Sequence, residues 1–348
     1  MPNPPPIHFK GIFPYSKMAS KPKVFMIGPG LIGWNILESL VDQGYSVTAL
    51  TRREQHAAGI RQSGGQAVMG TLDDLDLITS HSAASDIIFQ CATGDNLALE
   101  QAILKAARQR AARSQRTIYV HTSGAKVFDD GAKGMFASEK IYHDDNRSDM
   151  GNVPDDAPHR DVDLMLVKAQ ESNELRGFLR LAIVLPPEVY GYDEKHDRLS
   201  IMFPNMTRFA LKHGYAPVIG EGVSLETQVH YRDLVRGYVD IMHYLEKEDD
   251  ANPYWLCENG KEFSWKEAAE VIGKALYDRG QITDPTPKQP PKELYSELCG
   301  GKTESYMGLN CRARAVRLRK LGWEAKEKGI WESYLEDELP VILRRAEK

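Results

Sequence analysis

The sequence predicts an α/β protein built on a doubly wound parallel sheet, a Rossmann fold, followed by a smaller C-terminal α/β domain. From Lys23 onward, short β-branched runs alternate with longer helical patterns, and the intervals are long enough for the crossovers that parallel strands require. A glycine-rich turn follows the first of these runs. The length of 348 residues also exceeds the size at which a single core usually stops growing, which favours a second domain.

The expected elements follow one another in a regular order. We expect strands at 24–27, 46–50, 66–68, 86–90, 117–121 and 178–185, and helices at 31–43, 53–62, 73–80, 96–113 and 159–175. After Pro187 the pattern loosens, with helices expected at 231–247 and 264–279. These ranges divide the chain into a disordered leader (1–20), a dinucleotide-binding domain (21–187) and a mixed region that holds the substrate domain (188–348), from which 229–247 returns to the first domain.

Composition excludes several classes of protein. Hydrophobic residues make up 42% of the chain and charged residues 27%, with a formal net charge of −5, so we expect neither nucleic acid nor a membrane surface as a partner. No apolar run reaches the roughly 20 residues that cross a bilayer. The four cysteines lie far apart without zinc-site spacing. We therefore expect a cytoplasmic protein without a structural metal, acting on a small-molecule substrate.

The segment GPGLIG (28–33) lies between the first expected strand and the first expected helix, which is the position of a dinucleotide fingerprint. Gly28 permits the tight turn, Gly30 lets a pyrophosphate approach the backbone, and Gly33 allows close packing of the helix. The helix N-terminus offers unpaired N–H groups to the phosphates. Pro29 removes one such donor. These residues predict a nicotinamide dinucleotide cofactor.

The end of the second expected strand indicates which cofactor is preferred. A carboxylate there would accept the ribose 2′-hydroxyl of NAD, whereas this chain has Arg52 and Arg53. Arginine suits the 2′-phosphate of NADP, and one charge-assisted hydrogen bond contributes roughly 1.5–3 kcal/mol. The sequence therefore predicts NADP, with NAD less favoured. A solvated arginine pair is the alternative.

Several further segments resemble, in the right order, the extended short-chain dehydrogenase/reductase superfamily, especially its NAD(P)-dependent epimerase/dehydratase-like members. They are HTSGAKVF (121–128), HRDVD (159–163), LPPEVYG (185–191), VHYRDLVRGYVDIM (229–242) and YWLCENGKEFSWKEAAEVIGKAL (254–276). HRDVD is similar to a motif of a fungal nucleoside-diphosphate-sugar-epimerase-like group. The resemblance implies a catalytic serine at Ser123 and a substrate domain that includes 254–276. It also implies further cofactor contacts at Leu31, Ile32, Ala92, Thr93, Pro186 and Val189.

The same resemblance leaves the proton donor open. Most members have a tyrosine four residues before a lysine that holds the nicotinamide ribose; here Lys168 matches the lysine and Leu164 replaces the tyrosine. Leucine cannot titrate, so Tyr142, His143 or His121 would have to supply the proton. Asp163 precedes Lys168 by five positions, about 140° around an ideal helix, which makes it a weaker candidate. Alternatively, Leu164 faces the core and Lys168 is a surface residue.

Three functions are compatible with these features. The leading interpretation is an NADP-dependent, carbonyl-reductase-like oxidoreductase with a non-standard acid/base residue. The second is a non-catalytic protein that senses the NADP redox state, and an open polar cleft at Ser123 would argue against it. The third is a nucleotide-sugar epimerase or dehydratase, for which the basic run 312–320 is the visible pyrophosphate contact. Helices 96–113 and 159–175 are expected to form a homodimer interface, as in the family.

Overall fold

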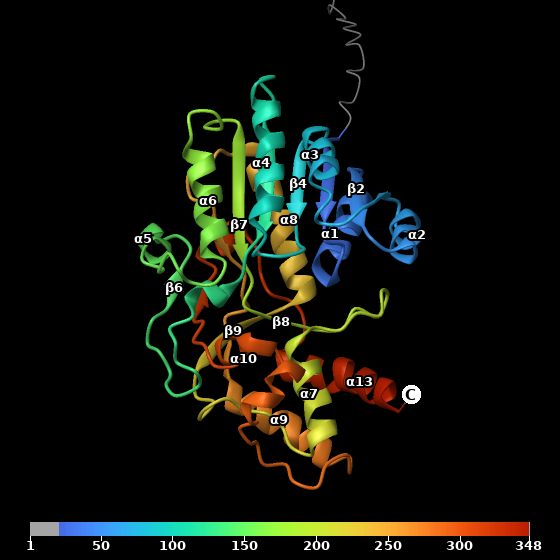
Figure 1. Ribbon diagram of the computed structural model, residues 1–348, viewed down its shortest axis with the longest axis vertical. Helices are drawn as coiled ribbons and strands as arrows, with labels where there is room; N and C mark the ends of the chain where they lie inside the picture. Colours follow the sequence, from blue (N-terminus) through green and yellow to red (C-terminus); the bar gives the residue numbers. More distant parts are fainter. Residues whose placement is uncertain (1–20, 348) are drawn as a thin grey trace, which may run out of the picture.

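The computed structural model describes residues 21–347. Within this range the main sheet has seven parallel strands in the order β10-β7-β5-β4-β1-β2-β3 (Figure 1). Their bounds are β1 Lys23–Ile27, β2 Ser46–Thr51, β3 Gln66–Met69, β4 Ile87–Gln90, β5 Thr117–Thr122, β7 Leu179–Leu185 and β10 Tyr254–Leu256. The order reverses between β1 and β4, which in doubly wound sheets is the place where a ligand binds.

Helices cover both faces of this sheet. Figure 1 shows α3, α4 and α6 in front of the strands and α8 behind them, and α8 packs closely on α1. Their bounds are α1 Leu31–Asp42, α2 Glu54–Gln62, α3 Leu75–Ala83, α4 Leu97–Ala111, α6 Arg160–Glu171 and α8 Tyr231–Lys247. The predicted doubly wound fold is confirmed.

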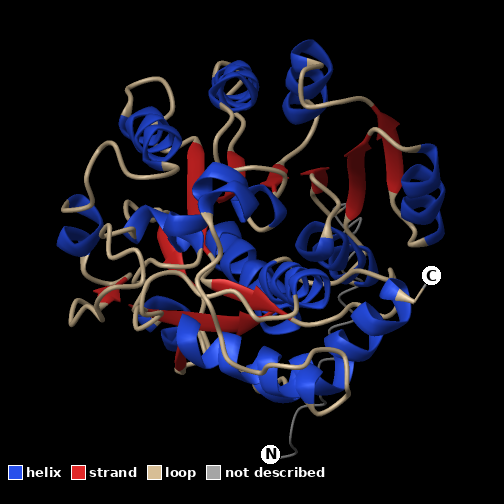
Figure 2. Cartoon of the chain, turned by 60° about the horizontal axis from the view of Figure 1, so that its bottom comes forward, coloured by secondary structure: helices blue, strands red, loops and turns tan. Residues whose placement is uncertain are grey.

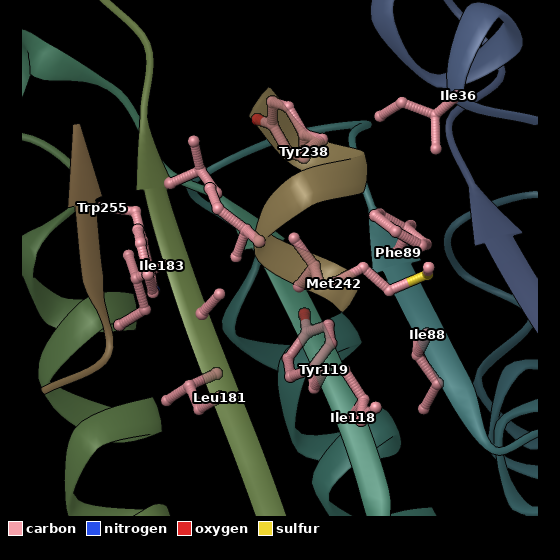
Figure 3. Packing of buried hydrophobic residues seen from close by; sticks show 14 of the residues in the cluster. Ile36, Ile88, Phe89, Ile118, Tyr119, Leu181, Ile183, Tyr238, Met242 and Trp255 are labelled. Carbon is pink, nitrogen blue, oxygen red and sulfur yellow. The ribbon is translucent and has the colours of Figure 1, made fainter. Parts of the chain in front are cut away.

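Burial explains why the strand sequences contain so few polar residues. All seven residues of β7 are buried, as are all four of β4, because helices exclude water from both faces of a parallel sheet. Figure 3 shows Tyr238 and Met242 of α8 against the strands, close to Tyr119 and Phe89. This contiguous apolar core fixes the strand ends that carry the candidate site.

A second core lies below the sheet in Figure 1, formed mainly by residues after 187. It surrounds a three-stranded sheet of order β11-β9-β8. Helices gather around it, as Figure 2 also shows, with Phe203, Trp265 and Tyr334 fully buried among them. The elements are β8 Glu188–Tyr190, α7 Met202–His213, β9 Leu225–His230, β11 Glu262–Ser264, α9 Trp265–Tyr277, η2 Lys292–Glu297, η3 Gly300–Lys302, α10 Thr303–Tyr306, α12 Ile330–Ser333, the π-helix Tyr334–Glu338 and α13 Leu339–Ala346.

Short elements join the two cores. The loop after β5 contains the 3-10 turn η1 (Ala125–Phe128), and β6 (Tyr142–His143) pairs with β12 (Ala313–Arg314). The helices α5 (Arg147–Gly151) and α11 (Val316–Lys320) flank this small sheet. Residues 129–158 therefore extend along the side of the molecule, held there by a strand from near the C-terminal end.

One segment differs from expectation, and another lies outside the description. The resemblance placed 254–276 in the substrate domain, but β10 within it adds an edge strand to the main sheet beside β7. Three residues are too few to produce a strand pattern in the sequence. The leader expected at 1–20 lies outside the described residues. Within 21–347, no helix combines the length and apolar character that a membrane crossing requires.

Candidate functional site

The turn 28–33 has a backbone that only glycine satisfies at two of its positions. Gly28 has φ +89°, and a Cβ there would lie 2.5 Å from the amide nitrogen of Ala92. A Cβ on Gly33 would lie 2.3 Å from the carbonyl oxygen of Gly28. At Gly30 the nearest atom would be 4.0 Å away, so the space over the middle of the turn is open. Tight packing below and open space above fit a pyrophosphate at the start of α1.

A groove of about 610 Å³ runs from this turn over the ends of β2, β3 and β4. Its lining residues are Gly28, Pro29, Gly30, Leu50, Thr51, Arg52, Arg53, His56, Gly70, Thr71, Leu72, Asp73, Cys91, Ala92, Asn96 and Arg198. Predicted contacts Gly28, Gly30, Arg52, Arg53 and Ala92 are among them. Thr93 is not, because both its backbone N–H and its carbonyl oxygen bind the side chain of Gln90.

Three arginines converge on this groove, and the sequence suggested only two of them. Arg198 comes from the loop between β8 and α7, its Nη2 lies 3.4 Å from Nε2 of His56, and its guanidinium lies over the ring of Trp34. Burial and the charges of Arg198 and Arg53 lower the pKa of His56. Within 21–347, neither Arg53 nor Arg198 forms an ion pair. A cluster of unpaired positive charges of this kind is suited to bind an anion.

A second cavity, of about 530 Å³, adjoins the groove and shares Gly30 and Cys91 with it. Most of its lining is apolar. The lining residues are Gly30, Leu31, Ile32, Cys91, Lys126, Pro187, Glu188, Val189, Leu199, Ser200, Ile201, Met202, Asn205, Leu298, Cys299 and Tyr306. Predicted contacts Leu31, Ile32 and Val189 are present. Pro186 lies just outside, where its carbonyl oxygen accepts a hydrogen bond from the N–H of Ala125.

Two ionisable side chains in this cavity were not anticipated from the sequence. The Lys126 ammonium donates to the carbonyl oxygen of Tyr306 at 3.1 Å and lies 3.5 Å from Oε1 of Glu226. Glu188, on the neighbouring strand, is 5% exposed. Burial raises the pKa of Glu188 well above the ordinary value, and the charge of Glu226 raises it further. A lysine inside HTSGAKVF and a glutamate inside LPPEVYG were the available signals, but neither segment indicates burial.

Ser123 does not line this cavity and lies in a buried polar cluster. Its Oγ donates to Oδ2 of Asp163 at 3.1 Å, and Ser123 is 8% exposed. The other oxygen of Asp163 lies 4.0 Å from Nε2 of His121, whose Nδ1 lies 3.3 Å from Oε1 of Glu100. Burial raises the pKa of Asp163 to about 6. The space around Ser123 is thus occupied by side chains, and Ser123 lines neither the groove nor the cavity.

The structure corrects the expected placement of Leu164 and Lys168. Lys168 is exposed, and both side chains line a separate surface groove between α4 and α6, together with Leu104 and Arg108. The face of α6 that points inward carries Val162, Asp163 and Leu166, all fully buried. Asp163, which we expected to point away, therefore occupies the position facing Ser123. An ordinary helix rotation of 100° per residue accounts for the difference.

The remaining acid/base candidates also lie away from the cavity. Tyr142 stacks on Phe128, with ring centroids 3.9 Å apart, and His143 lies 3.5 Å from Oδ2 of Asp149. Neither lines the cavity. His121 is fully buried in the interior described above. Of the three proposed donors, none is within the walls of either space.

The basic run 312–320 does not present free cations. Arg312 and Arg314 both bind Glu262, at 2.9 and 2.7 Å. Arg317 binds Asp250 at 2.6 Å, and Arg319 binds Glu258. Because each arginine already has a carboxylate partner, the predicted contact with a substrate pyrophosphate is not supported by this arrangement. No group of potential metal ligands is present among residues 21–347.

Comparisons with known proteins agree with this geometry. Residues 28–150 match the family model described as NAD(P)H-binding. Oxidase ucsJ of an Acremonium species is 28% identical over 75% of this chain and 80% of its own length. A UDP-glucose 4-epimerase of Thermotoga maritima superposes with a TM-score of 0.65 at 14% identity, covering 94% of this chain and 100% of that one.

A yeast methylglyoxal/isovaleraldehyde reductase, Gre2, solved with NADPH, superposes with a TM-score of 0.61, also at 14% identity, covering 94% of this chain and 100% of that one. At this identity the likeness concerns the fold. The family match, by contrast, begins at the glycine turn and includes the arginines after β2. Residues 28–150 are therefore an NAD(P)H-binding region, and the fold of the chain is similar to that of the epimerase and the reductase.

Proposed function

We propose that the protein is an NADP(H)-dependent oxidoreductase that reduces a carbonyl compound or oxidises the corresponding alcohol. The groove and the cavity meet at Gly30 and Cys91, so a dinucleotide lying across the glycine turn would have its adenosine half in the groove and its nicotinamide half at the cavity. The bound nicotinamide supplies hydride chemistry. The protein contributes the turn that binds the phosphates, the arginines and the walls of the cavity.

The arginine cluster is the observation that carries the choice of NADP. A 2′-phosphate at the end of β2 would lie among Arg52, Arg53 and Arg198, the last of which comes from a different part of the chain. Charge-assisted hydrogen bonds of roughly 1.5–3 kcal/mol correspond to a preference of about tenfold to a hundredfold over NAD. The carboxylate that would favour NAD is absent at this position, where Thr51 ends the strand.

Calorimetric titration of the full chain with NADPH and with NADH tests this proposal. Replacing Arg52 and Arg53 together by alanine should weaken NADPH binding about tenfold to a hundredfold and change NADH binding by less than about threefold. Arg113→Ala, an exposed arginine at the other end of the sheet, is the matched control and should change neither affinity. Equal losses for both cofactors, or tighter binding of NADH by the wild type, would contradict the proposal.

The alternatives receive less support from the geometry. An epimerase acting on a nucleotide sugar needs contacts for a substrate pyrophosphate, and the arginines of 312–320 are already paired with carboxylates. A redox sensor without catalysis fits the filled surroundings of Ser123. It does not account for the cavity beside Lys126 and Glu188, which is large enough for a small molecule and opens on the same glycine turn.

A homodimer formed through α4 and α6 is a separate proposal. The groove between these helices holds about 740 Å³ and is lined by Leu104, Leu164 and Met165, with charged residues around them. Apolar side chains inside a charged rim are typical of protein interfaces. Light scattering at micromolar concentration should give twice the 39.1 kDa mass of the chain. The mass of a single chain would exclude this dimer under those conditions.

A further inference from the structure

The cavity next to the glycine turn has mainly apolar walls with a few polar side chains among them. Leucine, isoleucine, valine and methionine side chains form much of the lining. Among residues 21–347, Lys126 and Glu188 are its only ionisable members apart from Tyr306 and two cysteines, and Ser200 and Asn205 are its other polar side chains. No arginine of the described part of the chain lines it. A ligand that fits these walls is mainly apolar and carries a polar group at one place, because unpaired polar atoms of the ligand would lose their hydrogen bonds to water.

Glu188 is buried but unpartnered. Its side chain is 5% exposed and forms no hydrogen bond or ion pair within 21–347. Glu226 and Glu338 each have one carboxyl oxygen that is completely buried without a hydrogen-bond partner. The carboxyl oxygens of Glu188, in contrast, are not completely buried. A buried carboxyl group that lines a cavity and binds no protein atom is available to a ligand.

The surrounding charges favour a proton on Glu188. Burial raises the pKa of Glu188 most, the charges of Glu226 on β9 and Glu338 in the π-helix raise it further, and the charge of Lys126 opposes them. Lys126 itself donates one hydrogen bond to the carbonyl oxygen of Tyr306 and forms an ion pair with Glu226, which leaves N–H donors for a ligand. One ammonium beside two buried carboxyl groups leaves one of the carboxyl groups better stabilised as the neutral acid.

We infer that Glu188 is the proton donor of this site, that Lys126 assists it, and that the substrate is a largely apolar carbonyl compound whose oxygen lies between these two side chains. The inference rests on the proposed oxidoreductase function. It gives a role in catalysis to two side chains that line the cavity. The helix positions at which the family has its tyrosine and lysine, here Leu164 and Lys168, lie outside the cavity.

The chemical step balances with the groups named. A reduced nicotinamide, when bound, would supply a hydride to the carbonyl carbon and would be oxidised, and the carbonyl π bond would break. The carbonyl oxygen forms an O–H bond with the proton of the Glu188 carboxyl group. Glu188 is left as a carboxylate near the ammonium of Lys126 and regains its proton from solvent. The product is an alcohol, and the reverse direction uses the same groups.

The test uses Glu188→Gln, which keeps the shape and hydrogen-bonding capacity of the acid but has no proton to give. The substrates are a series of straight-chain aldehydes, butanal, hexanal, octanal and decanal, with consumption of NADPH as the readout. In the wild type kcat/KM should rise by roughly fourfold for each methylene that the cavity buries. Glu188→Gln should lower kcat by about 10²–10⁴-fold, and Glu188→Asp should recover part of the loss.

Two measurements separate this inference from the proposed function. NADPH affinity of Glu188→Gln should equal that of the wild type, and infrared spectra at neutral pH should show that the variant has lost part of the protonated-carboxyl absorption. Glu221→Gln, an exposed glutamate of the same region, should change neither spectrum nor rate. A wild type that fails to bind NADPH would refute the proposed function.

If NADPH binds but no aldehyde of the series is reduced, the inferred substrate class is wrong. If aldehydes are reduced equally well by Glu188→Gln, Glu188 is not the proton donor. An unchanged infrared absorption in the variant would show that Glu188 is ionised in the wild type and would likewise overturn its role. Melting temperatures of all variants establish that each compared protein is folded.

Discussion

The groove and the cavity on either side of Gly30 use positive charge in different ways. In the groove, Arg52 and Arg53 are exposed and have no carboxylate partner among the described residues. In the cavity, the Lys126 side chain is 15% exposed and is held by Glu226 and a backbone carbonyl. An exposed cation costs little in the free protein and is available to a ligand. A buried cation is part of the folded structure, because neighbouring buried carboxyl groups depend on it.

Removing the buried cation should have the largest effect on stability. Lys126→Met leaves the Glu226 carboxylate buried without its ion-pair partner, which should lower the free energy of unfolding by about 3–5 kcal/mol near neutral pH. The pKa of both glutamates is raised in the folded state. The folded protein is therefore more stable at low pH, where both glutamates are protonated, and becomes less stable as the pH rises and they ionise. The defect should therefore shrink on acidification. Urea unfolding across pH measures it, and a defect that does not vary with pH would contradict this account.

Asp163 sharpens the comparison, since it is a buried acid that lies outside both spaces. Its pKa in the fold is about 6, above its ordinary value of 3.8, so ionising it costs up to about 3 kcal/mol as pH rises through this interval. Asp163→Asn cannot ionise. Its stability relative to the wild type should therefore increase between about pH 4 and about pH 7. If the free energies of unfolding of the two proteins changed with pH in parallel, ionisation of Asp163 would not destabilise the fold.

The arginine supplied by the C-terminal region should affect cofactor binding and leave stability nearly unchanged. Arg198→Ala removes one cation from the groove and should weaken NADPH binding about tenfold, the equivalent of roughly 1.4 kcal/mol. The melting temperature should shift by no more than a few degrees. Titration calorimetry and thermal unfolding on the same samples decide the matter. A large stability loss with unaltered NADPH affinity would mean that Arg198 resembles Lys126 instead.

The smallest effect is expected at the position that sequence resemblance made central. Lys168→Ala removes an exposed side chain on the outer face of α6 and should change NADPH affinity by less than about twofold, within the range of a surface charge. Leu164→Tyr should likewise fail to raise aldehyde reduction. A marked loss of NADPH affinity in Lys168→Ala would show that α6 turns toward the cofactor when the cofactor binds.

The sheet was predictable because each of its longer strands has a local signature. Buried parallel strands are rich in β-branched and apolar residues, so β5 and β7 could be located within a residue of their observed starts. The glycine turn was equally local, since its geometry depends on three residues in one hexapeptide. In contrast, β10 has three residues, and only its pairing with β7 identifies it as part of the sheet.

The orientation of α6 explains why the predicted position of Lys168 in the active site is wrong. Val162, Leu166 and Ala169 are buried at helical spacing, and that apolar pattern was visible in the sequence. The match of Lys168 to the family motif predicted the opposite orientation of the helix. Lys126 and Glu188 could not be located because their burial depends on Glu226 and Tyr306, far away in the chain. Sequence reading treats isolated charged residues in short segments as solvated, and here tertiary packing determines otherwise.

The long separation in sequence between β7 and its edge partner β10 has a consequence for folding during synthesis. The strand beside which it pairs, β7, ends at Leu185, whereas β10 begins at Tyr254. During translation the outer edge of β7 remains without its partner while the intervening residues are synthesised. An unpaired edge of a mainly apolar strand is a template for association with other chains. Pairing with Tyr254–Leu256 covers this edge, so β10 protects β7 from such association once residues up to 256 have been added.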